Sequence, residues 1–108
     1  MMNSFTEAVE VENLVVIKVR GDINIQSSPC LRQSLTPHYH GKKGIIVDLS
    51  RVSTMDCSGI ATLVEGLQWS RKSQKPFALT GINSQVRGIF SLTKVDDLFT
   101  ILSGKTKK

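Results

Sequence analysis

The feature that most constrains the fold is a short apolar run followed directly by a segment with helical periodicity. The run GIIVDLS, residues 44–50, stands between turn-forming residues, which is typical of a strand at the centre of a sheet that is covered on both faces. Over residues 56–72 the apolar side chains recur instead at helical spacing, as Ile60, Leu63, Val64 and Leu67. The sequence therefore predicts a central strand and a helix that packs against it.

The rest of the chain repeats this alternation of apolar runs and amphipathic segments. Further strands are predicted over residues 5–11, 14–20, 76–81 and 98–102, and further helices over residues 28–35 and 84–92. The segment GDIN, residues 21–24, is predicted to break the second strand. Strands that alternate with helices pair mostly in parallel, because right-handed crossovers connect them. The order ββαβαβαβ thus indicates an α/β domain.

Composition restricts the class of protein. A chain of 108 residues with 40% hydrophobic and 21% charged residues is expected to form one globular domain. Its apolar runs are far shorter than the ~20 residues of a membrane-spanning helix, and the first ten residues lack a signal-peptide pattern. We therefore expect a cytoplasmic protein without direct membrane insertion.

The net charge of +5 does not indicate nucleic-acid binding. Three lysines of the last five residues supply much of this charge, and aromatic residues are not interleaved with the remaining basic residues. Cys30 and Cys57 lie 27 positions apart without the spacing of a zinc site. The sequence predicts neither a metal nor a cofactor, and no nucleic-acid partner.

The stretch RVSTMDCSG, residues 51–59, holds the candidate reactive side chains. Asp56 is suited to cap the helix that begins there, because its carboxylate accepts hydrogen bonds from first-turn amides. Nucleophilic catalysis would require a general base within reach of Cys57 or Ser58. The only histidines, His38 and His40, lie in a predicted loop beside a proline. The sequence therefore does not predict an enzyme.

The side of the 57–72 helix opposite its apolar stripe carries a second set of candidate residues, namely Ser58, Thr62, Glu65 and Trp69. Tryptophan is enriched at the centres of protein interfaces. This side is predicted to be an exposed docking surface. The alternative is that Trp69 folds over a neighbouring loop.

Three segments of the chain resemble the STAS domain, the module of bacterial anti-sigma factor antagonists. GDIN resembles the family's G-E-L-D turn, VDLSRVSTMDCSG its strand followed by M-D-S-S-G, and residues 82–102 its closing segment. The resemblance implies one domain over residues 1–103, with a mixed, mostly parallel sheet and helices largely on one side. Residues 104–108 are expected to form a basic flexible tail.

The resemblance also implies a function. In such antagonists the first serine of D-S-S-G is phosphorylated by a partner kinase that is itself the anti-sigma factor. The chain is therefore expected to be a regulatory module that binds an anti-sigma factor/serine kinase. The partner-binding residues expected are Gly21, Asp22, Asn24, Asp56, Cys57 and Ser58, together with the docking side at Thr62, Glu65 and Trp69.

The phosphoacceptor position is Cys57 in this chain, with the hydroxyl of Ser58 beside it. Three interpretations remain open at this point. Ser58 takes the phosphate instead, the domain is locked in its binding state, or the thiol is itself a sensor. A helix N-terminus favours a thiolate, whereas the neighbouring Asp56 opposes it.

STAS-like domains also occur as subunits of bacterial ABC-type lipid transport complexes. The alternative function is therefore a STAS subunit that binds the ATPase of such a complex.

Overall fold

The computed structural model describes residues 5–41, 43–95 and 97–102. They form one sheet of five strands in the spatial order β1-β2-β3-β4-β5. The strands are β1 (Thr6–Val11), β2 (Leu14–Ile23), β3 (Gly44–Met55), β4 (Phe77–Thr80) and β5 (Thr100–Leu102). β1 pairs antiparallel with β2, and every other pair is parallel. The predicted mixed, mostly parallel sheet and the order ββαβαβαβ are confirmed.

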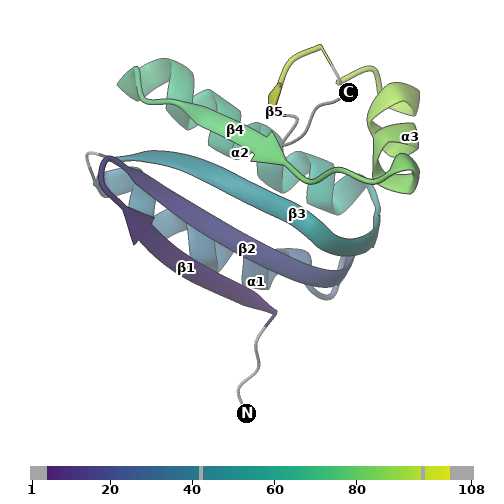
Figure 1. Cartoon of the computed structure of the whole chain (residues 1–108). Helices are drawn as coiled ribbons and strands as arrows, with labels where there is room; N and C mark the ends of the chain where they lie inside the picture. Colours follow the sequence, from purple (N-terminus) through teal and green to yellow (C-terminus); the bar gives the residue numbers. More distant parts are fainter. Residues whose placement is uncertain (1–4, 42, 96, 103–108) are drawn as a thin grey trace.

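The helices of the described residues are α1 (Ser28–Leu35), the short 3₁₀ helix η1 (Thr36–His40), α2 (Cys57–Ser73) and α3 (Ser84–Leu92). Figure 1 shows α1 and α2 side by side behind the sheet. Helices therefore lie largely on one side, as predicted. None of these helices is long and apolar enough to cross a membrane.

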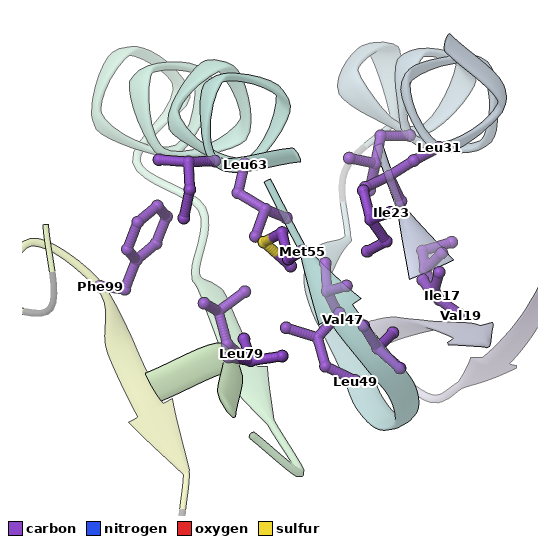
Figure 2. Packing of buried hydrophobic residues seen from close by; sticks show 14 of the residues in the cluster. Ile17, Val19, Ile23, Leu31, Val47, Leu49, Met55, Leu63, Leu79 and Phe99 are labelled. Atoms are coloured by element: carbon purple, nitrogen blue, oxygen red, sulfur yellow. The ribbon is translucent and has the colours of Figure 1, made fainter. Parts of the chain in front are cut away.

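The core lies between the sheet and this helix layer. Figure 2 shows Leu31 of α1 and Leu63 of α2 projecting toward buried side chains of the strands. Val47 and Leu49 of the central strand β3 are fully buried, while the alternate residues Ile46 and Asp48 are only partly buried. The prediction of a central strand is correct. The expected coverage of both its faces is wrong, because α1 and α2 cover the same face.

The second strand does not end where the sequence predicted. β2 continues through Gly21 and Asp22 to Ile23, and β3 is correspondingly longer and ends at Met55. The pairing of β2 with β3 continues through two shifts of register, one between Lys18 and Arg20 and one between Gly21 and Ile23. Gly21 has a φ of 90°, a conformation that side chains disfavour. The glycine thus bends the strand without breaking the sheet.

The helical stripe of α2 faces the sheet as predicted. Ile60 and Leu63 are buried, and Val64 and Leu67 pack at the border of the core. The expected basic tail over residues 104–108 lies outside the described residues.

Truncation of Leu63 tests this packing. We expect Leu63→Ala to lower the free energy of unfolding by about 2–5 kcal/mol, because the side chain is fully buried and leaves a cavity. Urea denaturation measures this loss. The matched control is Leu92→Ala, since Leu92 is exposed, and it should change stability by less than about 0.5 kcal/mol. A loss below about 1 kcal/mol for Leu63→Ala would contradict the placement of α2.

Candidate functional site

The two most specific motifs of the sequence meet at one end of the sheet. The N–H of Asp56, just before α2, donates a hydrogen bond to the carbonyl oxygen of Ile23 at the end of β2, over 2.9 Å. The turn that follows β2 therefore lies beside the first turn of α2. Residues 21–24 and 56–59, separate in the sequence, form one surface.

Asp56 caps α2, as predicted. Its Oδ1 accepts hydrogen bonds from the backbone N–H of Ser58 at 2.9 Å and from the Ser58 hydroxyl at 2.5 Å. The hydrogen bond from the Ser58 hydroxyl, supported by backbone amides, lowers the pKa of the exposed Asp56 carboxyl below its ordinary value. Asp56 is therefore ionised at neutral pH, and its carboxylate accepts the hydrogen bond of the Ser58 hydroxyl.

The turn after β2 is held by side-chain hydrogen bonds. Ser27 Oγ donates to the carbonyl oxygen of Asp22 at 2.8 Å and accepts from the N–H of Asn24 at 2.9 Å. Asn24 Oδ1 accepts from the N–H groups of Gln26 and Ser27 at 2.9 and 3.1 Å. Such Asn-based turns replace backbone hydrogen bonds by side-chain ones. The conformation of the turn is thus fixed before any partner binds.

A further contact ties this turn to β3. Thr54 Oγ1 donates to Asp22 Oδ1 at 3.1 Å. Neither Thr54 nor Ser27 was predicted as a site residue. For Thr54 the reason is that the strand was expected to end at residue 50, whereas β3 continues to Met55.

Gly59 fixes the distance between α2 and the sheet. A Cβ atom at this position would lie 2.6 Å from Ile23 Cγ2 and 2.6 Å from Met55 Cγ. Real Cβ atoms do not approach carbon atoms so closely, so the entrance of α2 rests directly on the ends of β2 and β3. This contact places Cys57 next to the turn.

The Cys57 side chain is accessible. Cys57 is the first residue of α2 and is exposed, whereas Ser58 is partly buried. Cys57 and the partly buried Cys30 are both free thiols.

The predicted exposure of Thr62 and Trp69 is wrong. Thr62 is only 1% exposed, and its Oγ1 donates to the carbonyl oxygen of Ser58 at 3.0 Å. Trp69 is partly buried, stacks on Tyr39 of η1 with ring centroids 5.2 Å apart, and donates from Nε1 to the Tyr39 carbonyl oxygen at 2.8 Å. Burial raises the pKa of Tyr39 to about 12. The structure shows the alternative arrangement, in which Trp69 covers a neighbouring segment.

Glu65 is exposed as predicted, but it is paired within the domain. Arg32 of α1 donates to both of its carboxylate oxygens, at 2.9 Å from Nε and 2.7 Å from Nη2. The side of α2 opposite the apolar stripe therefore faces α1 and η1, which explains why it carries polar and aromatic residues.

His38 and His40 lie on η1, not in an open loop. η1 packs beside Trp69 through Tyr39. Trp69 follows Cys57 by twelve residues, which corresponds to about 18 Å along the axis of α2. The segment that carries both histidines is thus at the far end of α2 from Cys57.

Residues 6–106 match the STAS domain. The chain belongs to the STAS domain family. It is 28% identical over 104 residues to an anti-sigma-B factor antagonist from Staphylococcus aureus, and the match covers 95% of this chain and 96% of the relative.

Solved STAS structures have the same fold. An anti-sigma-factor antagonist (STAS) domain protein from Planctomyces limnophilus superposes with a TM-score of 0.82 at 18% identity, over 93% of this chain and 91% of that chain. The anti-sigma factor antagonist SpoIIAA in its unphosphorylated form superposes with a TM-score of 0.78 at 18% identity, over 94% of this chain and 89% of that chain.

Gly59→Ala tests the close contact at the entrance of α2. We expect the free energy of unfolding to fall by about 1–3 kcal/mol, because the added methyl group must displace Ile23 or Met55. The matched control is Gly88→Ala in α3, where a Cβ meets nothing within 4 Å. That change should instead stabilise the domain by about 0.5–1 kcal/mol, since alanine favours the helix. Equal effects of the two substitutions in chemical denaturation would contradict the contact.

Acid titration tests the Asp56 cap. A carboxyl whose pKa is lowered by folding contributes stability that is fully present above its unfolded pKa, here the ordinary 3.8. That contribution is lost as the pH falls from there through the folded pKa. Asp56→Asn keeps a good capping side chain but removes this titration. We expect its free energy of unfolding, measured at a series of acidic pH values, to fall less steeply than that of the wild type. Superimposable curves would contradict the role of Asp56.

Proposed function

We propose that this STAS domain binds an anti-sigma factor that is a serine kinase. The proposed contact surface consists of Gly21, Asp22, Asn24, Asp56, Cys57 and Ser58. Its support is twofold. The anti-sigma-B factor antagonist from Staphylococcus aureus matches this chain over nearly the full length of both proteins. This match favours the proposed function over that of a transport-complex subunit. The two motifs that resemble the family's switch region are also joined by the hydrogen bond from Asp56 to Ile23.

We also propose that the domain has lost the phosphorylation switch of its relatives and stays in its binding state. The observation that carries this proposal is the contrast between two neighbouring side chains. Cys57 is exposed at the start of α2, where the first-turn amides and the helix dipole would favour a phosphate. The hydroxyl of the next residue, Ser58, donates to Asp56, and Ser58 is partly buried.

The chemical consequence of a cysteine at this position is the absence of a charge switch. A phosphoserine adds about −1.5 to −2 charges, enough to disrupt an interface formed around a neutral hydroxyl. A thiol is not the acceptor of a serine kinase. The surface around Cys57 thus keeps its charge in the presence of kinase and ATP.

Incubation with the cognate kinase and ATP tests this proposal. Wild-type protein is expected to remain unphosphorylated, whereas Cys57→Ser should accept phosphate on the new hydroxyl, because serine supplies the acceptor without added bulk. Mass spectrometry locates the phosphate. The double variant Cys57→Ser/Ser58→Ala is the control that assigns the site, and it should be phosphorylated as well.

Two outcomes would count against the proposal. Phosphate on Ser58 of the wild type would show that the acceptor has moved by one residue and that the switch is intact. Failure of Cys57→Ser to accept phosphate would show that the kinase does not recognise this surface.

A further inference from the structure

The turn beside the site exposes a large apolar side chain. Ile25 is 77% exposed and directly follows Asn24. Asp56, at the entrance of α2, donates from its backbone N–H to the carbonyl oxygen of Ile23, two residues before Ile25, so Ile25 lies close to that entrance. It is therefore part of the same surface as Cys57.

Two small side chains are exposed on the first turns of α2, close to the turn that carries Ile25. Cys57 is exposed, and so is Ala61, which lies one turn further along the same side of the helix. We name these three residues, Ile25, Cys57 and Ala61, the Ile25 patch. A single exposed apolar residue is common on protein surfaces, but this patch joins the turn after β2 to the first turns of α2.

The turn holds Ile25 in place. Asn24 Oδ1 accepts from the backbone of both Gln26 and Ser27, and the Ser27 hydroxyl closes the turn on Asp22 and Asn24. A side chain whose backbone is already ordered loses less conformational entropy when it binds. These hydrogen bonds therefore order the backbone of the turn, and the Ile25 side chain is exposed to solvent from this ordered backbone.

The border of the Ile25 patch is acidic, although the chain has a net charge of +5. Asp22 and Asp56 are both exposed beside the patch. The nearest basic side chain along α1, that of Arg32, is already paired with Glu65. A complementary partner would therefore combine an apolar pocket with a rim of lysine or arginine.

We infer that Ile25 is the apolar anchor of the partner-binding surface and inserts into a pocket of the anti-sigma factor that is bordered by basic side chains. This inference rests on the proposed function. Ile25 then takes the place at the centre of the interface that was predicted for Trp69. The Trp69 ring instead stacks on Tyr39 within the domain. Apolar side chains that enter a desolvated pocket contribute most of the affinity of many interfaces.

Isothermal titration of the purified cognate anti-sigma factor kinase with the full chain tests the inference. Ile25→Gln should raise the Kd about ten- to hundredfold, because burial of an isoleucine side chain is lost. The matched control is Leu92→Gln, since Leu92 is equally exposed, at 78%, but lies on α3. It should leave the Kd unchanged. Thermal unfolding of both variants verifies that the domain is folded.

Each outcome separates this inference from the function on which it rests. Wild-type binding with an unchanged Kd for Ile25→Gln would overturn the role of Ile25 and leave the proposed function standing. Equal weakening by Leu92→Gln would also overturn it, because the effect would not be specific to the patch. No binding by the wild type would overturn both.

Discussion

The close contact between the entrance of α2 and the ends of β2 and β3 is the constraint on which the site depends. Gly59 leaves room only for its own hydrogen atoms beside Ile23 and Met55, and the Asp56 N–H closes the same junction through the Ile23 carbonyl. A larger residue at position 59 would push α2 away from the sheet. Cys57 would then move away from the turn after β2, and the surface would separate into two unrelated segments.

Two sides of α2 contact other elements of the domain. One side of the helix packs on the sheet through Ile60 and Leu63. The other side meets α1 and η1 through the Arg32–Glu65 ion pair and the stacked Tyr39 and Trp69 rings. The first turn of α2 is exposed at Cys57 and lies beside the turn after β2, so it is the part of α2 that forms the proposed contact surface. The proposed partner-binding surface is centred where Asp56 caps the helix.

The proposed loss of a phosphorylation switch rests on the chemistry of this first turn. Asp56 is kept ionised and holds the Ser58 hydroxyl, so the two polar side chains next to Cys57 satisfy each other. The accessible group is a thiol, flanked by a rigid turn that exposes Ile25. The proposed continuous binding rests on this combination of a thiol that a serine kinase does not phosphorylate, a hydrogen-bonded turn and an exposed isoleucine.

The sequence by itself determined the α/β class, the order of elements, the central strand, the core stripe of α2, the cap at Asp56 and the family. These are local or periodic properties, recorded in residue spacing. Tertiary structure alone decided the rest. β2 extends past Gly21 because β3 offers hydrogen bonds beyond the predicted break, and Trp69 is partly buried because η1 lies against it. Helical spacing defines which side of α2 a residue occupies, but only the neighbouring elements decide whether that side meets solvent.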